Sequence, residues 1–168
     1  KKNDIANGPG IRVSLFVSGC RHRCKNCFNS EAWDFNYGNP FTQKTIDEIL
    51  AMLKPSHVKG LTLLGGEPFE QQNQPEIVNL LRQIKAAYPE KSIWAFSGYI
   101  FDKDILAGRL GPWEITKEFL SYLDVLVDGP FVMGKKDVAF MAICAVAFAF
   151  IIRLKINGAF DFYYYPYV

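Results

Sequence analysis

An excess of charge of one sign, a long apolar run and a leader segment are all missing from this sequence, and each absence excludes a class of protein. The 168 residues carry 19 Lys and Arg against 17 Asp and Glu, a net charge of +2 that is too small for a strongly basic nucleic-acid binder. No apolar run reaches the ~18 residues of a membrane span, and the polar first residues do not resemble a signal peptide. Because 49% of the residues are apolar, intrinsic disorder is excluded as well. We expect a soluble cytoplasmic protein that binds no nucleic acid and has no membrane anchor.

Cysteine is also scarce, but three of the four cysteines lie within eight residues, at positions 20, 24 and 27. In a chain without an export signal, clustered cysteines are metal ligands more often than disulfide partners. The residues between them are basic or polar, which is unlike an apolar core. Positive charge beside a thiol favours the thiolate form that binds metals. The spacing Cys-x3-Cys-x2-Cys therefore predicts a metal centre.

Two kinds of metal centre fit these residues. A structural zinc site needs a fourth ligand, for which His22 and Cys144 are candidates, although His22 is only two residues from both Cys20 and Cys24. In a 4Fe-4S cluster, three cysteines leave one iron open to bind and orient a substrate. Cys144 lies among Ala and Phe residues, where we expect an inert buried thiol.

Hydrophobic periodicity predicts strands that alternate with helices. We expect strands over residues 11–17, 60–64, 92–96 and 124–127, and helices over residues 43–53, capped by Thr42, 74–87 and 114–123. This alternation, with short connections, is typical of βαβ units in a parallel sheet. The loops that follow parallel strands share one edge of the sheet, so the cysteine loop and residues 65–67, 97–99 and 128–129 are predicted to form one composite site.

The cysteine spacing, in the loop after the first strand, resembles the signature of radical S-adenosylmethionine (SAM) enzymes. Phe28 follows the last cysteine, as an aromatic residue does in one branch of them. Gly65-Gly66-Glu67-Pro68 is similar to the Gly-Gly-Glu segment that holds the methionine amino group of SAM. Two glycines let a strand edge approach a ligand, and a carboxylate can pair with an ammonium group.

Further blocks narrow the resemblance to the activating proteins of anaerobic ribonucleoside-triphosphate reductase. They include Asn7-Gly8-Pro9-Gly10, Leu15-Phe16-Val17-Ser18-Gly19, Ser97-Gly98-Tyr99 and residues 125–131. The resemblance implies an α/β fold, a partial, open (βα) barrel with a parallel sheet. It implies an oxidoreductase whose 4Fe-4S cluster takes an electron from a flavodoxin-like donor, cleaves SAM reductively and forms a glycyl radical on the large subunit of the reductase.

Residue by residue, the resemblance implies three cluster ligands, Cys20, Cys24 and Cys27. It implies that Asn26, Phe28, Gly65, Gly66 and Glu67 contact SAM or support its site. Ser97 and Asp128 end later strands on the same edge, where ordinary turn chemistry also accounts for them. Arg12, Arg21, Arg23 and Lys25 are expected to bind an acidic partner or the SAM carboxylate, or to form a solvated basic rim. His22 is expected at the surface or behind the ligands, not as a ligand itself.

Two other functions remain open. The chain can be the activase of another glycyl-radical enzyme, such as pyruvate formate-lyase, or a non-catalytic module that binds a metal or docks a partner.

The C-terminal tail of the chain bears on the second of these functions. We expect residues 1–137 to form the radical SAM domain and residues 138–168 to be an atypical apolar tail, packed on or completing the same domain. Its 15 consecutive apolar residues, 138–152, are expected to form a buried helix or a pair of strands. In the tail 25 of 31 residues are apolar, and nothing there resembles the ending of the family, which suggests an altered C-terminus.

Overall fold

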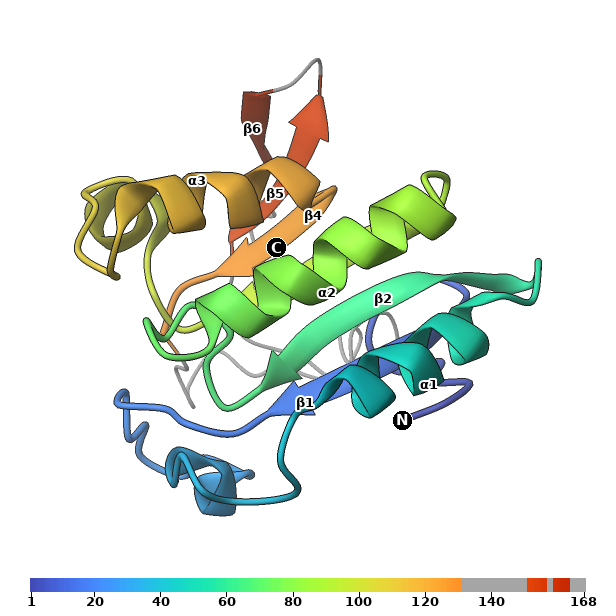
Figure 1. The fold of residues 1–168 in the computed structure, drawn as a ribbon. Coiled ribbons are helices and arrows are strands. Elements are labelled where there is room, and N and C mark those ends of the chain that lie inside the picture. Colours follow the sequence, from blue (N-terminus) through green and yellow to red (C-terminus); the bar gives the residue numbers. More distant parts are fainter. Residues whose placement is uncertain (131–150, 157–158, 164–168) are drawn as a thin grey trace.

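A six-stranded sheet forms the centre of the computed structural model, which describes residues 1–130, 151–156 and 159–163 (Figure 1). The strands follow one another across the sheet in chain order. They are β1 (Ile11–Val17), β2 (Val58–Gly65), β3 (Ser92–Ser97), β4 (Val125–Asp128), β5 (Ile151–Ile156) and β6 (Ala159–Tyr163). The first four are parallel, as the βαβ pattern predicts, while β5 pairs antiparallel with β4 and β6 antiparallel with β5. The curvature of a partial barrel stays a prediction.

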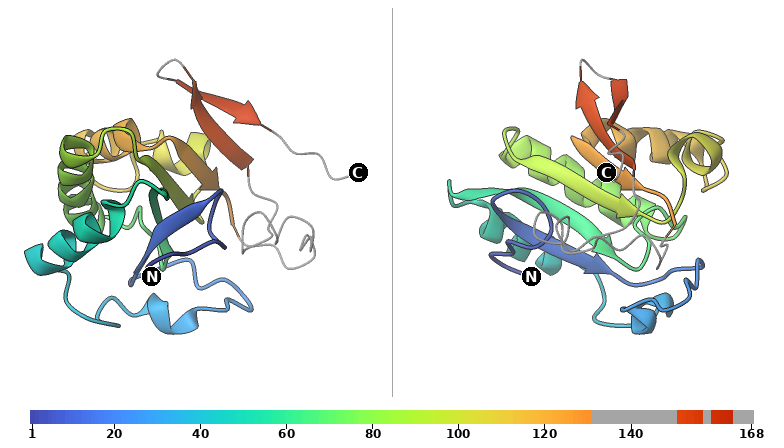
Figure 2. Two further views of the ribbon diagram at one scale, coloured as in Figure 1. Left: turned by 90° about the vertical axis from the view of Figure 1, so that its right-hand side faces the viewer. Right: turned by 180° about the vertical axis from the view of Figure 1, so that it is seen from behind.

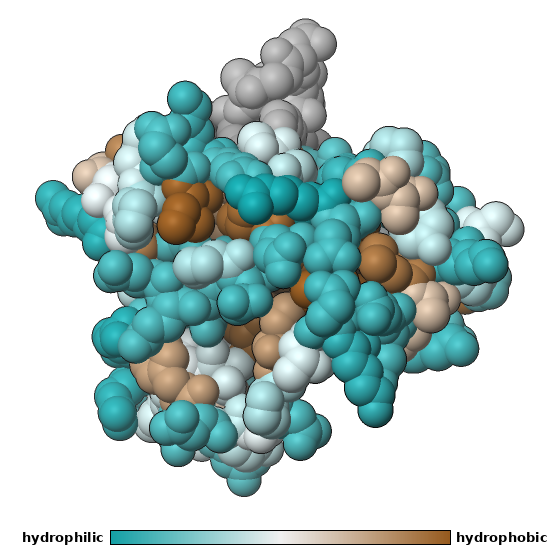
Figure 3. All heavy atoms as spheres, in the orientation of Figure 1, coloured by the Kyte–Doolittle hydropathy of each residue, from teal (hydrophilic) through white to brown (hydrophobic). Residues whose placement is uncertain are grey.

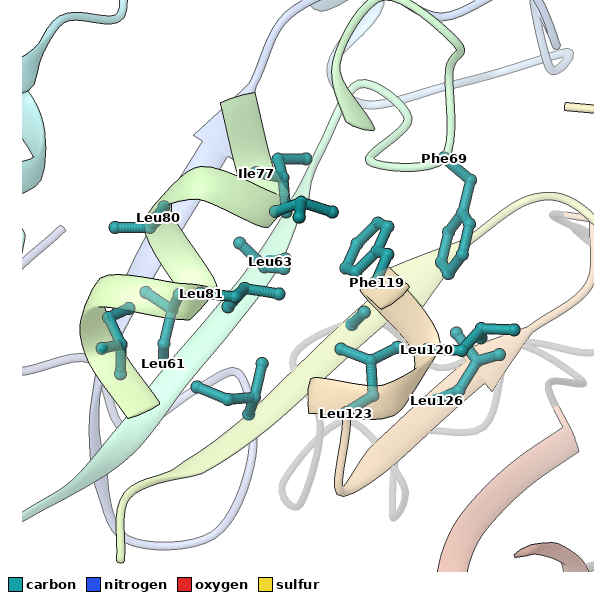
Figure 4. Close-up of a cluster of buried hydrophobic side chains, with 14 of the residues drawn as sticks. Leu61, Leu63, Phe69, Ile77, Leu80, Leu81, Phe119, Leu120, Leu123 and Leu126 are labelled. Atoms are coloured by element: carbon teal, nitrogen blue, oxygen red, sulfur yellow. The ribbon is translucent and has the colours of Figure 1, made fainter. Parts of the chain in front are cut away.

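Three helices cover one face of this sheet, α1 (Gln43–Leu53), α2 (Gln74–Ala87) and α3 (Trp113–Tyr122) (Figure 2). Apolar residues at helical spacing on α2 and α3 pack on alternate residues of β2 and β4 (Figure 4). Two of the core rings, Phe69 and Phe119, are stacked with their centroids 4.4 Å apart. The outer surface of the helices is mostly hydrophilic (Figure 3). The helices therefore bury one face of the sheet and do not cover its other face.

The predicted elements agree closely with the structure. β1, α1 and α2 have the expected bounds, and the backbone N–H of Thr42 donates to Thr45 Oγ1 (3.3 Å) where the helix cap was expected. The expected strand over residues 60–64 is longer, β3 extends one residue further than expected, and β4 and α3 are each shifted by one residue. Two short elements were not predicted, a 3-10 helix (Ser30–Trp33) and a π-helix (Phe101–Ile105).

The first residues of the chain pack on the sheet face opposite the helices. Asp4 and Arg12 exchange two backbone hydrogen bonds of 2.8 Å. The Asp4 carboxylate accepts hydrogen bonds from Ser14 Oγ (2.7 Å) and Asn7 Nδ2 (2.5 Å). Burial disfavours the charged form of this carboxylate. Its hydrogen bonds, of which the one from Ser14 has the largest effect, outweigh burial and hold the pKa of Asp4 well below its usual range. The first residues of the chain thus cover the polar side chains that β1 presents on this face of the sheet.

The expectation that Arg12 binds a partner or SAM, or forms part of a solvated rim, is wrong. Its side chain alternates away from the helices and lies 1% exposed beneath the N-terminal segment. The guanidinium donates to Thr62 Oγ1 (2.7 Å) and to the carbonyl oxygens of Leu61 (2.8 Å) and Ser92 (2.9 Å), and it lies over the Trp94 ring. Burial lowers the pKa of Arg12 to about 10. Arg12 therefore joins β1, β2 and β3.

The tail contributes the hairpin of β5 and β6 to the sheet. The buried helix or pair of strands expected over residues 138–152 stays a prediction. Residues 131–150, 157–158 and 164–168 lie outside the described part of the chain. Cys144 and most of the apolar run 138–152 fall among them. None of the helices in the described ranges has the length and apolar character needed to cross a membrane.

Candidate functional site

One pocket lies where the four parallel strands end. The arrowheads of β1, β2 and β4 point to the same side of the sheet, and the long loop after β1 lies there (Figure 1). The pocket has about 760 Å³ of empty space, which includes the open solvent at its mouth. Of the residues that the sequence singled out, it is lined by Cys20, His22, Cys24, Cys27, Phe28, Gly65, Gly66, Glu67 and Ser97. Asn26 and Asp128 do not line it. The composite site predicted at this edge is thus present.

The cysteine loop turns back on itself, and its three cysteines all line the pocket. Arg23 and Asn26 adopt left-handed backbone conformations, with φ of 47° and 62°. The N–H of Cys27, the residue after Asn26, donates to the carbonyl of Cys24 (3.1 Å). All three cysteines are free thiols; Cys20 is buried and the other two are half-buried. Three thiols presented together without a disulfide are a donor set suited to an iron–sulfur cluster.

The Gly-Gly-Glu segment lies against the start of this loop. The N–H of Gly66 donates to Val17 O (2.7 Å), and that of Glu67 donates to Gly19 O (2.9 Å). A Cβ on Gly66 would lie 2.6 Å from Gly19 O and 2.9 Å from Ala32 O. Glycine is therefore required here by the close approach of two backbones of this chain, apart from any ligand.

The Glu67 carboxylate is 1% exposed and holds three loops together. Oε1 accepts from Phe69 N and Ser97 Oγ (both 2.9 Å). Oε2 accepts from Gly98 N (2.7 Å) and lies 3.1 Å from His22 Nε2. These contacts fill the four lone-pair positions of a carboxylate, so the ammonium group of a ligand would have to share one of them. Glu67 supports the site by joining the ends of β2 and β3 to the cysteine loop.

His22 lines the pocket together with the three cysteines. Besides Glu67, its ring contacts the ring of Tyr99, with centroids 4.3 Å apart. A Cβ on Gly98 would lie 2.8 Å from the His22 ring, so the absence of a side chain there makes room for the imidazole. Burial lowers the pKa of His22, but the hydrogen bond and charge of Glu67, with the charges of Glu70 and Asp104, outweigh burial and raise it. The expectation that His22 is not a ligand stays a prediction.

The expectation that neighbouring positive charge favours the thiolate is wrong for Cys20. Burial raises the pKa of this thiol to about 11, and the Glu67 charge adds to that effect. Hydrogen bonds from the backbone N–H groups of His22 and Arg23 act in the opposite direction but are weaker. Arg21 brings no net charge, since its guanidinium pairs with the buried Glu70 carboxylate. A bound metal ion would have to displace the proton of this thiol.

The remaining polar residues that were singled out have partners in the protein or solvent. Asp128 is buried and accepts from the Phe101 N–H (2.7 Å), which is turn chemistry, and Ser97 serves Glu67. Arg23 lies over the Trp33 ring, and Lys25 is exposed. Within residues 1–130, 151–156 and 159–163, no three His, Cys, Asp or Glu side chains gather as a single metal ion would need. Glu70 was not selected from the sequence. The only pattern that could have indicated it is its place as a second acidic residue shortly after the Gly-Gly-Glu segment.

Comparisons with known proteins give the site its context. The family described as "4Fe-4S single cluster domain" matches residues 6–142. An activating protein of anaerobic ribonucleoside-triphosphate reductase from Enterobacteria phage T4 is 44% identical over 129 residues, which are 76% of each chain. Its namesake from Escherichia coli K12 is 41% identical over 136 residues, 80% of this chain and 83% of the relative. That from Vibrio cholerae is 39% identical over 137 residues, with the same shares. The chain therefore belongs to the family of anaerobic ribonucleoside-triphosphate reductase-activating proteins, with a 4Fe-4S single cluster domain.

Proposed function

We propose that this protein is a radical SAM activase that forms a glycyl radical on the large subunit of anaerobic ribonucleoside-triphosphate reductase. The observation that carries the proposal is the meeting, in one pocket, of the three thiols of the cysteine loop with the Gly65-Gly66 edge. The names of relatives at 37–44% identity supply the target enzyme. Cys20, Cys24 and Cys27 are the proposed ligands of the cluster, and SAM is the proposed second cofactor.

Cys20, Cys24 and Cys27 would hold the cluster, which would supply the electron for reductive cleavage of SAM and so the chemistry for removing a hydrogen atom from a glycine of the reductase. The residues of the chain itself position SAM and shield it from water. Gly65 and Gly66 present a strand edge without side chains to the methionine end of SAM. Leu64 and Phe96 form an apolar wall that excludes water, and Phe28, 70% exposed, is free to cover SAM beside Asn26.

We also propose a domain organisation, an electron donor and a cellular location for the protein. Residues 1–137 form the radical SAM domain, a partial barrel, and residues 138–168 complete the same domain; the pairing of β5 with β4 supports this. The electron donor is a flavodoxin-like protein of the cytoplasm. Arg23 and Lys25, both exposed beside the half-buried Cys24, give an acidic donor a basic surface to approach.

Anaerobic reconstitution tests this proposal. The purified protein is loaded with iron and sulfide, reduced, and mixed with SAM, and 5′-deoxyadenosine is measured. A brown protein that releases it supports the proposal. A colourless protein that holds one zinc ion refutes it, and a brown protein that never cleaves SAM indicates a non-catalytic module. Electron paramagnetic resonance then identifies the target, because a glycyl radical must form on the reductase and not on pyruvate formate-lyase.

A further inference from the structure

Two backbone hydrogen bonds close the cysteine loop at its base, and Trp33 takes part in this closure. The N–H of Gly19 donates to Ala32 O (2.8 Å), and the N–H of Cys20 donates to Trp33 O (3.2 Å). The backbone of Gly66 lies against the same closure, because a Cβ on Gly66 would be 2.9 Å from Ala32 O. The backbone of Trp33 is therefore held close to both Cys20 and Gly66.

The indole of Trp33 is covered by a cation on one side. Trp33 is half-buried and lines the pocket together with the three cysteines. The Arg23 guanidinium lies over the indole, 5.7 Å from the ring centroid, but Arg23 is not among the residues that line the pocket. The guanidinium therefore covers the side of the indole that is turned away from the pocket. Attraction between the cation and the ring holds the side chain in this position.

Two other aromatic side chains line the pocket, Phe28 and Phe96, and their surroundings differ from those of Trp33. Phe28 is 70% exposed, and in the part of the chain that the structure describes residues 24–28 make no hydrogen bond to another segment. Phe96 lies within β3, in register with the buried Val127 of β4, as part of the apolar wall. Of the three rings, the indole is the largest, and it is held next to the cysteines.

We propose that Trp33 binds the adenine base of SAM by stacking, on the side of the indole opposite Arg23. This inference rests on the proposed function, which makes SAM the ligand of the pocket, and it assigns the residue that binds the nucleoside half. The base is the only aromatic part of SAM, and aromatic side chains stack on the π face of a base. Because Trp33 is held close to Cys20 and Gly66, its ring lies near the residues proposed for the cluster and for the methionine half, as one ligand with two ends requires.

Equilibrium dialysis of the reconstituted protein with SAM and with methionine separates stacking from a structural role. Trp33→Leu removes the aromatic surface, and Trp33→Phe keeps a smaller one. Trp113→Leu is the matched control, because Trp113 lies on α3 and does not line the pocket. We expect the Kd for SAM to rise roughly tenfold in Trp33→Leu, to rise less in Trp33→Phe, and to stay unchanged in Trp113→Leu. The Kd for methionine, which has no base, is expected to be the same in Trp33→Leu as in the wild type. An unchanged Kd for SAM in Trp33→Leu overturns the inference, and so does an equal rise for methionine.

Indole fluorescence of the cluster-free protein tests the stacking independently of SAM cleavage. 5′-Deoxyadenosine carries the base without the methionine half, and a base stacked on an indole quenches its fluorescence. We expect millimolar 5′-deoxyadenosine to quench the wild type and Trp113→Leu but not Trp33→Phe, which retains Trp94 and Trp113. Equal quenching in the wild type and Trp33→Phe overturns the inference, as does a wild type that is not quenched. A wild type that binds no cluster or never cleaves SAM refutes the proposed function, and the fluorescence of the cluster-free protein then decides the role of Trp33 alone.

Discussion

Replacing Glu67 by glutamine removes one acceptor from a buried carboxylate that uses all of them. Each oxygen of Glu67 accepts one fixed backbone N–H, from Phe69 at Oε1 and Gly98 at Oε2. Each oxygen also has one adaptable partner, the Ser97 hydroxyl or the His22 ring. The hydroxyl can rotate and the imidazole can change tautomer, so both can accept from an amide NH₂. The backbone groups cannot, and either orientation of the glutamine amide leaves one buried N–H facing another N–H.

The cost of that mismatch follows from the burial. An unsatisfied buried N–H costs about 1–3 kcal/mol, and the loss of charge from the remaining hydrogen bonds adds to it. We expect Glu67→Gln to lower the free energy of unfolding of the cluster-free protein by about 3 kcal/mol. For a chain of this size that is a fall of roughly 6–12 °C in Tm.

Thermal and urea unfolding under anaerobic, reducing conditions measure this difference. Glu48→Gln is the matched control, because Glu48 is exposed on α1 and its replacement should change the free energy of unfolding by less than about 0.5 kcal/mol. If Glu67→Gln unfolds at the same temperature as Glu48→Gln, then the four contacts do not hold the loops together, and the reasoning is refuted.

Three other predictions follow from the same structure. Replacing any one of the three loop cysteines by serine should remove bound iron and 5′-deoxyadenosine release, whereas Cys144→Ser should keep both; iron analysis and visible absorbance check this, and iron retained by a loop variant would contradict it. Because the Asp4 pKa is lowered, its carboxylate stabilises the fold fully above the ordinary pKa of ~4, and the contribution is lost as the pH falls. The advantage of the wild type over Asp4→Asn in urea unfolding should therefore be constant near neutral pH and shrink below about pH 4; an advantage independent of pH would show that the charge is not involved. Gly66→Ala should cost at least about 2 kcal/mol, since its Cβ would lie 2.6 Å from Gly19 O, while Gly38→Ala, at a φ of 88° with open space around it, should cost about 1 kcal/mol of backbone strain. Equal costs in denaturant titrations would argue against the close approach.

The parts of the fold that the sequence predicted are those with a local cause. The apolar spacing of α1 and α2 and the β-branched run of β1 depend on neighbouring residues only, and their bounds agree with the structure. The location of the site was predictable because parallel strands end at one edge, a rule that needs no side-chain detail. Arg12 is the opposite case. Its burial depends on the segment around Asp4 folding back over the far face of the sheet, which no pattern in β1 signals.

The cysteine loop shows how far a charge pattern can mislead. In the sequence, basic residues alternate with the three cysteines and suggest uniform positive charge around all of them. In the fold, Arg21 is paired with Glu70 and His22 contacts Glu67, both carboxylates being buried. Only Arg23 and Lys25 keep their charge at the surface. The loop thus has a neutral half anchored around Cys20 and a basic, exposed half around Cys24. Two acids that lie more than 40 residues further along the chain create that division, which is why spacing alone identified the three thiols but not their different surroundings.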